Sequence, residues 1–314
     1  MKITAVLGAL LVVFIWGINP AISKLGLQEI PPYTFLTIRY AITAAIFLPF
    51  ARPYKRELKQ MFMVALTSNV IVNLLIYVAY RDLSPSACSL LLQTEGPISV
   101  IMACIWPKES INFKQSMSIL LSFVGVAVIM GIPDMSFVGV ALILLSRIFW
   151  GFCQIVFKDT KHISVPVFAA YSYLFALPFT AIGSIFYEHY DYRKLAEVNW
   201  DVAGWPMAFE VVVLTFAMFM WQRLIAANGV NKIAPFSTLR IIFGIAAGVI
   251  MFDDEIDWQI MVGAILVTWG VVLTMKEFNI ILRTHAKSVV VYRRAHRLFM
   301  ERKLKRAGLR KKYR

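Results

Sequence analysis

Charge is scarce in this chain of 314 residues. Charged residues make up 16% of it and apolar residues 59%, and its mean hydropathy is +0.69. A soluble domain does not carry that much apolar surface without aggregating, so the composition indicates a protein of the bilayer. The stretches between the apolar runs are short, apart from residues 188–204 and a tail after 276. This leaves no room for a soluble domain.

Cysteine and histidine are scarce as well. The three cysteines (Cys88, Cys104 and Cys153) lie inside apolar runs and suggest no disulfide framework. The four histidines fall outside the runs, which argues against a buried histidine proton relay. We also find no zinc spacing, no paired carboxylates within one run, no nucleophile–base pair and no phosphate-cradling glycine loop. We therefore expect neither an enzyme nor direct use of ATP, and we expect no metal and no cofactor.

Apolar runs of about 17 to 23 residues, each suited to cross a hydrocarbon core, are what the sequence has in abundance. Ten of them can be placed, near 4–24, 33–50, 61–80, 85–106, 115–131, 136–157, 165–187, 205–226, 234–252 and 259–276. The first run, which follows Lys2, also fits a signal peptide. It continues to Lys24 without a small-residue cleavage pattern, however, so we expect it to be a transmembrane helix.

One sequence motif occurs twice and indicates an internal duplication. Trp16-Gly17 is followed by Lys24, and Trp150-Gly151 is followed at the same spacing by Lys158. A proline follows each lysine after eight residues. Duplicated membrane chains are typical of transporters. Because five helices are an odd number, the second copy must start on the opposite side of the membrane, which predicts inverted repeats.

A second correspondence supports the duplication. Glu109, Phe113 and Gly125 have the same mutual spacing as Asp254, Trp258 and Gly270, each pair being 145 positions apart. At this offset Glu95 in the first copy corresponds to Arg240 in the second. The predicted fold is therefore an all-α membrane protein of ten transmembrane helices. It is divided into a first five-helix repeat (1–131), a second, inverted five-helix repeat (132–276) and a basic cytoplasmic tail (277–314).

The distribution of Lys and Arg predicts the orientation. If ten helices alternate, the loops at 51–60, 107–114 and 158–164 and the tail lie on one side, and they hold most of the Lys and Arg. The other side carries the acidic residues around Asp253. The positive-inside rule then places both termini in the cytoplasm, in a multi-pass protein of the inner membrane.

Ionisable residues inside the runs are the first place to look for function, because a charge at the bilayer centre costs roughly 2.5–3.5 kcal/mol even on the most lenient scale. Glu95 and Arg147 lie near the middle of their runs, and Arg39 and Arg240 about a third of the way along theirs. Glu95 could form a structural bridge to one of these arginines, or it could contact substrate or a coupling proton. The two interpretations are compatible if the bridge opens during transport. Glu210 and Arg223 are expected to reach water from the ends of their run.

Neutral polar residues extend the candidate site. Asn69, Asn73 and Tyr77 recur every four residues and draw one stripe that either lines an aqueous cavity or joins two helices. Trp16 and Asn19 on the first run are the rough counterpart of Trp150 and its neighbours; packing or interfacial anchoring is as good an interpretation of the tryptophans as substrate stacking. The predicted substrate-binding residues are Trp16, Asn19, Asn69, Asn73, Tyr77, Glu95, Arg147, Trp150 and Arg240.

The tail is strongly basic. Fourteen Lys and Arg from Lys276 to Arg314, against two Glu, supply +12 of the net charge of +14. Interleaved apolar residues predict a segment that lies on anionic cytoplasmic lipid. We do not expect nucleic-acid binding on a membrane carrier.

The chain resembles the drug/metabolite transporter superfamily, in particular its EamA-type members. The resemblance rests on Trp16-Gly17-x-Asn19 with the trailing Lys24, Pro32, the acidic residues Glu109 and Asp254, and Gly125 and Gly270. The stretches 11–19, 89–93 and 233–235 are similar to the O-acetylserine/cysteine exporter branch. The resemblance implies a carrier that moves small metabolites by alternating access.

Two departures concern the substrate. Amino-acid exporters of this type commonly have an uncharged residue where this chain has Glu95, and an apolar one at the position of Arg240. We expect an exporter of small metabolites such as amino acids or their derivatives. The alternative is a broad exporter of drugs or cationic compounds coupled to protons through Glu95.

Overall fold

The computed structural model describes residues 3–98, 101, 113–132, 135–158, 160, 162–228 and 233–271, and every regular element in these ranges is helical. The predicted tail, Cys104, and the side chains of Gln154 and Lys158 lie outside the described part. The first half comprises α1 (Ile3–Glu29), α2 (Pro32–Phe47) with η1 (Leu48–Phe50), α3 (Lys55–Val64), η2 (Ala65–Val72), α4 (Asn73–Asp82), α5 (Pro85–Leu91), η3 (Leu92–Thr94) and α7 (Phe113–Ile129). The second comprises α8 (Phe137–Lys158), α9 (Val165–Phe186), η4 (Tyr192–Ala196), α10 (Trp200–Ala208), η5 (Phe209–Leu214), α11 (Thr215–Asn228), η6 (Ala234–Leu239), α13 (Arg240–Phe252) and a last helix over Trp258–Val271.

The helices have the length and apolar character of membrane spans. Within the described residues, five are long and apolar enough to cross a bilayer: Ile3–Glu29, Pro32–Phe50, Lys55–Asp82, Val165–Phe186 and Trp200–Trp221. Shorter apolar helices cover Ser116–Ile129, Phe137–Cys153, Phe236–Phe252 and Trp258–Val271. Large apolar side chains on the outside of the bundle are exposed, for example Ile250 at 80%, as expected of a surface that meets lipid.

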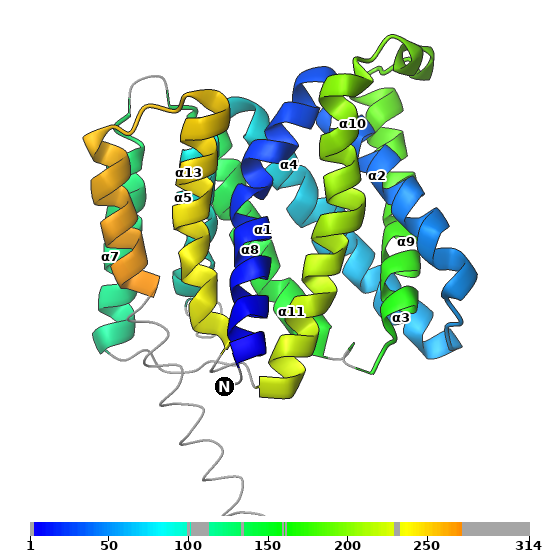
Figure 1. Ribbon diagram of the computed structural model, residues 1–314, viewed down its shortest axis with the longest axis horizontal. Coiled ribbons are helices and arrows are strands. Elements are labelled where there is room, and N and C mark those ends of the chain that lie inside the picture. The colour runs from blue at the N-terminus through cyan, green and yellow to red at the C-terminus, as the bar shows by residue number, and fades with distance from the viewer. Residues whose placement is uncertain are drawn as a thin grey trace, which may run out of the picture.

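The helices stand roughly alongside one another, so their ends form two faces (Figure 1). The start of α1 and the turn from α2 to α3 lie at the lower face, which we call the N-terminal face. The segment 187–199 and the link from α13 to the last helix lie at the opposite face.

Contacts between helices join the two halves of the chain. α2 packs along α9, α1 packs along α10, α11 and α13, α5 packs along α13, and α4 with η2 packs along α8. The largest buried cluster, which includes Tyr40, Leu91, Ile143 and Tyr173, lies between α2, α5, α8 and α9. Each hydrophobic cluster among the described residues is therefore built from both halves.

Glycines bring particular helix pairs into backbone contact. A Cβ at Gly17 would lie 2.6 Å from Phe243 Cβ and 2.8 Å from Arg240 O, so α1 touches the first turn of α13. α7 meets the last helix in the same way: Gly125 lies against Val267, and Gly270 lies against Ser122. Ser118 Oγ also donates a hydrogen bond of 2.6 Å to Gly270 O. Small residues at such crossings are typical of membrane helix packing.

Two long helices contain a π-helical segment. η2 interrupts the helical stretch 55–82, and η5 interrupts the stretch 200–228. π-Helical turns widen the helix and are found frequently at functional sites. Asn69 lies in η2 and Glu210 in η5.

Candidate functional site

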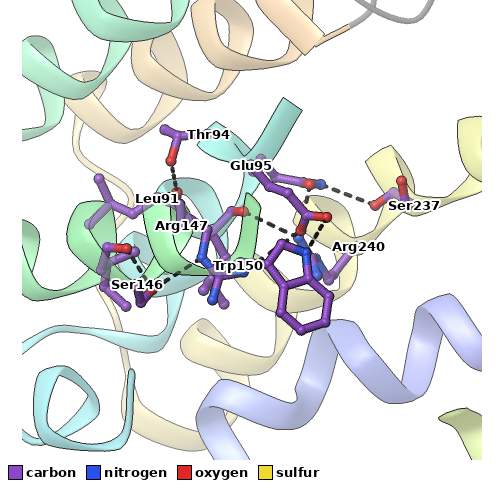
Figure 2. Close-up of polar contacts among 11 residues, drawn as sticks. Leu91, Thr94, Glu95, Ser146, Arg147, Trp150, Ser237 and Arg240 are labelled. Atoms are coloured by element: carbon purple, nitrogen blue, oxygen red, sulfur yellow. Dashed lines mark hydrogen bonds and ion pairs between the residues drawn. The ribbon is translucent and has the colours of Figure 1, made fainter. Parts of the chain in front are cut away.

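Glu95 lies at the centre of a group of polar side chains contributed by different helices (Figure 2). The indole N–H of Trp150 donates a hydrogen bond of 2.6 Å to Glu95 Oε1, and Arg147 Nη1 lies 3.7 Å from Glu95 Oε2. Arg147 and Trp150 share a face of α8 because they are three residues apart. The Arg147 side chain is 5% exposed and that of Glu95 is 30% exposed. Of the arginines considered from the sequence, Arg147 is thus an ion-pair partner of Glu95.

Arg240 completes this group from the start of α13. Its Nη2 donates hydrogen bonds to Gln93 Oε1 at 3.0 Å and to Leu92 O at 3.4 Å. Gln93 Nε2 in turn donates to Ser237 O at 3.1 Å, which ties η3 to η6. Among the described residues the hydrogen-bond partners of Arg240 are neutral, and its Nε is buried without one. We call Gln93, Glu95, Arg147, Trp150 and Arg240 the central cluster. It holds one carboxylate and two guanidinium groups.

The Arg39 side chain belongs to a second group. Arg39 Nη1 lies 3.1 Å from Glu210 Oε2 and donates a hydrogen bond of 2.8 Å to the Tyr77 hydroxyl. Ser23 Oγ donates to the other oxygen of Glu210. We call Ser23, Arg39, Tyr77 and Glu210 the Arg39–Glu210 cluster; it joins α1, α2, α4 and η5.

The expectation that Glu210 reaches water is wrong. Its side chain is fully buried, whereas Arg223 is exposed as expected. The predicted run began near 205, which put Glu210 close to the end of its helix. The helix instead begins at Trp200, so Glu210 lies about 15 Å inside at 1.5 Å per residue. A carboxylate ten residues inside a helix would have marked Glu210 as a candidate functional residue. It was missed from the sequence because the predicted run began five residues after the observed start of the helix.

The polar stripe of the third helical stretch is packed against α2. The Tyr40 hydroxyl donates to Asn69 O at 2.7 Å and accepts a hydrogen bond of 3.0 Å from Asn73 Nδ2. Tyr40 also stacks on Tyr173 of α9, with ring centroids 5.0 Å apart. Asn69 and Tyr77 are buried and Asn73 is half-buried. In this conformation the stripe connects helices, and Asn69 Nδ2 has no hydrogen-bond partner among the described residues.

Trp16 and Asn19 both lie on α1. The Trp16 ring packs on Trp221 of α11, with centroids 4.9 Å apart, and is half-buried. Asn19 lies one turn before Ser23 on the same face, and its Oδ1 is buried without a hydrogen-bond partner in the described part of the chain. This places Asn19 on the side of α1 that carries the Arg39–Glu210 cluster.

Acidic side chains cap the starts of two helices at the face opposite the N-terminus. Glu188 accepts hydrogen bonds from Tyr33 N at 2.8 Å and Thr34 N at 3.0 Å, so it caps the first turn of α2. Asp254 accepts one from Ser86 N at 3.0 Å in the first turn of α5. Lys24 Nζ donates to Leu83 O at 2.5 Å. Negative side chains at helix N-termini are favourable, so these contacts hold this end of the bundle together.

Comparison with known proteins agrees with this architecture. The sequence model of the EamA-like transporter family matches residues 3–131 and 137–276. A "Probable amino-acid metabolite efflux pump" of Salmonella typhimurium is 24% identical over 87% of this chain and 95% of its own length. A protein of the same description from Escherichia coli is 25% identical over 85% of this chain and 93% of its own. A solved crystal structure, 14% identical, covers 87% of this chain and 96% of its own with a TM-score of 0.50, a likeness that concerns the fold alone.

Proposed function

Because the chain belongs to the EamA-like transporter family, we propose that it is a secondary exporter of amino acids or their derivatives that works by alternating access. The observation that carries this proposal is the central cluster. It gathers a carboxylate that is 30% exposed, two guanidinium groups and an indole ring between η3, α8 and α13. Relatives described as amino-acid metabolite efflux pumps support the same substrate class.

The proposed architecture is ten transmembrane helices in two inverted repeats, 1–131 and 132–276. The two ranges of the family match support a duplication. So do paired contacts at the offset of 145. Gly125 against Val267 is the image of Gly270 against Ser122, and Gly125 against Gly263 O is the image of Gly270 against Ser118 O. Reciprocal contacts of this kind are expected around a two-fold axis in the membrane plane.

The proposed substrate is a zwitterion or a carboxylate. Arg240 holds a positive charge among neutral oxygens, and a substrate carboxylate would supply a bidentate partner for it. Glu95 would then meet the ammonium group. A lipophilic cation is a poorer fit, since Arg147 and Arg240 would repel it. Trp16, Asn19, Asn69, Asn73 and Tyr77 are proposed to line the path when the bundle opens.

The proposed location is the inner membrane with both termini in the cytoplasm. The face that carries the N-terminus is then the cytoplasmic one, and the contacts of Glu188 and Asp254 close the outer face. The basic tail would lie on anionic lipid. A proton is the proposed coupling ion.

Transport of labelled amino acids into proteoliposomes tests this function. Each amino acid is compared with its decarboxylated amine, for the wild type and for Arg240→Gln. We expect wild-type exchange to be inhibited by amino acids, and Arg240→Gln to weaken inhibition by the carboxylate-bearing member at least tenfold. Inhibition by the amine should change little, because that ligand has no group for Arg240. Arg223→Gln, which changes an exposed arginine, is the control. Equal weakening for both members of each pair would contradict carboxylate recognition by Arg240.

A further inference from the structure

Glu210 is the most deeply buried acidic side chain in the described part of the chain, and the central cluster does not include it. It lies in the π-helical segment η5. Its Oε2 is 3.1 Å from Arg39 Nη1, and its Oε1 accepts a hydrogen bond from Ser23. The contact therefore joins α1 and α2 to a helix that begins at Trp200, far away in the sequence.

The environment of Glu210 offers few partners for a full negative charge. A carboxylate has about four lone-pair sites, and among the described residues the hydroxyls of Ser23 and Tyr77 and the guanidinium of Arg39 are directed toward this one. In a membrane protein such a carboxylate is expensive to keep charged, and such residues mark ion paths and proton relays. Loss of the charge by protonation removes that cost.

Arg39, in contrast, is well held without Glu210. The Tyr77 hydroxyl accepts its hydrogen bond, and the rings of Tyr40, Tyr77 and Tyr173 each lie with their centroids 5.9 Å from the guanidinium carbon. Aromatic rings at this distance stabilise a cation. The tyrosines thus keep Arg39 in place when its counter-ion is neutral, so the pair can break without either member leaving.

We propose that Glu210 binds the coupling proton of the transport cycle. This inference rests on the proposed transporter function and concerns a different carboxylate from Glu95. A proton from water forms an O–H bond with a carboxylate oxygen of Glu210, and the ionic attraction to Arg39 is lost. Loss of the proton to water restores the pair. Because the pair connects α2 to η5, proton occupancy is linked to how firmly these two helices hold each other.

Glu95 in the central cluster is less suited than Glu210 to bind the coupling proton. Glu95 is 30% exposed, and it is met by both an indole N–H and a guanidinium. The partial exposure of Glu95 suits recognition of a substrate group, whereas Glu210 is fully buried. The proton and the substrate therefore occupy separate carboxylates, and occupancy of one site can influence the other through the helices between them.

Titratable side chains of α2 and α4 face Glu210. Arg39 and Tyr40 come from α2, and Tyr77 and Tyr80 from α4. The tyrosines remain neutral near physiological pH, which leaves Arg39 as the cation of this cluster. In this proposal, a proton on Glu210 removes the negative charge that Arg39 faces.

The test compares two modes of transport in the same proteoliposomes. Exchange of labelled against unlabelled amino acid at equal pH needs no net proton movement, whereas accumulation driven by an imposed pH gradient does. For Glu210→Gln we expect the ratio of gradient-driven to exchange transport to fall at least tenfold. Glu57→Gln is the matched control. Glu57 is also buried, but it accepts from its own helix start at Tyr54 N, and the ratio should stay at the wild-type value.

The experiment distinguishes failure of the Glu210 proposal from failure of the proposed transporter function. Gradient-driven transport by Glu210→Gln at the wild-type ratio overturns the proposal, and so does an inserted variant that loses exchange and gradient-driven transport together. If the variant fails to insert, or if the wild type exchanges no amino acid, labelling of wild-type protein with dicyclohexylcarbodiimide decides. This reagent modifies protonated carboxyl groups in apolar surroundings. We expect mass spectrometry to find Glu210 modified increasingly as pH falls, and absence of modification at every pH also overturns the proposal.

Discussion

Glu95 has two interpretations, substrate recognition and a structural ion pair with Arg147, and one substitution distinguishes them. Glu95→Gln keeps the shape of the side chain and deletes its charge, which leaves the 5% exposed Arg147 without the partner at 3.7 Å. If Glu95 recognises substrate, the variant should insert normally and lose at least tenfold in transport. Detergent thermal stability and exchange, measured on the same preparation, check this.

The structural interpretation of Glu95 predicts a different pattern. An uncompensated buried guanidinium destabilises a protein. Stability should then fall in Glu95→Gln and recover, together with transport, when Arg147→Gln removes the second charge. Transport at wild-type rate in stable Glu95→Gln would rule out a role in substrate recognition.

At the scale of helices, the contact between α1 and α13 depends on the absence of a side chain at Gly17. A Cβ there would meet a backbone oxygen at 2.8 Å, and backbone cannot move aside as a side chain can. We expect Gly17→Ala to lower stability by about 1–3 kcal/mol, the usual cost of overpacking, and to reduce transport because Arg240 begins α13. A denaturation series of the purified protein measures the first effect.

Gly204 provides the matched control at the same scale. It also lies inside a helix, but a Cβ at Gly204 would be 3.9 Å from its nearest neighbour, Trp200. Alanine should therefore stabilise this position by roughly 0.5–1 kcal/mol through its better helix propensity. Equal effects of the two substitutions would show that the close approach of α1 to α13 contributes nothing.

For the whole molecule, the central prediction is its orientation. Residues 51–60, 107–114, 158–164 and the tail should be cytoplasmic, and 188–204 and 253–258 external. In a background without native cysteines, Tyr187→Cys should react with an impermeant thiol reagent in intact cells, and Tyr54→Cys only after lysis. Both tyrosines are well exposed, and Tyr54 precedes α3 whereas Tyr187 follows α9. The turn before α3 and the segment after α9 lie at opposite faces of the bundle (Figure 1). Labelling of both in intact cells would contradict the orientation.

The sequence by itself determined the class of the protein and the positions of most helices. Long apolar runs have few stable alternatives to helices in a bilayer, and prolines such as Pro32 and Pro85 stand at observed helix starts. The runs near 33–50, 165–187 and 234–252 agree with the helical stretches to within a few residues. Glu95, Arg147 and Arg240 could also be selected, because an ionisable residue inside an apolar run is visible without a structure.

Only the tertiary structure decided which of these charges meet. Partner choice depends on how far each residue lies along its helix and on which face it lies, and both change with small errors in helix boundaries. Arg39 meets Glu210 across the two halves of the chain, while Arg147 meets Glu95 and Arg240 meets Gln93. The burial of Glu210 followed from a helix that begins five residues before the predicted run, because each residue adds about 1.5 Å of depth.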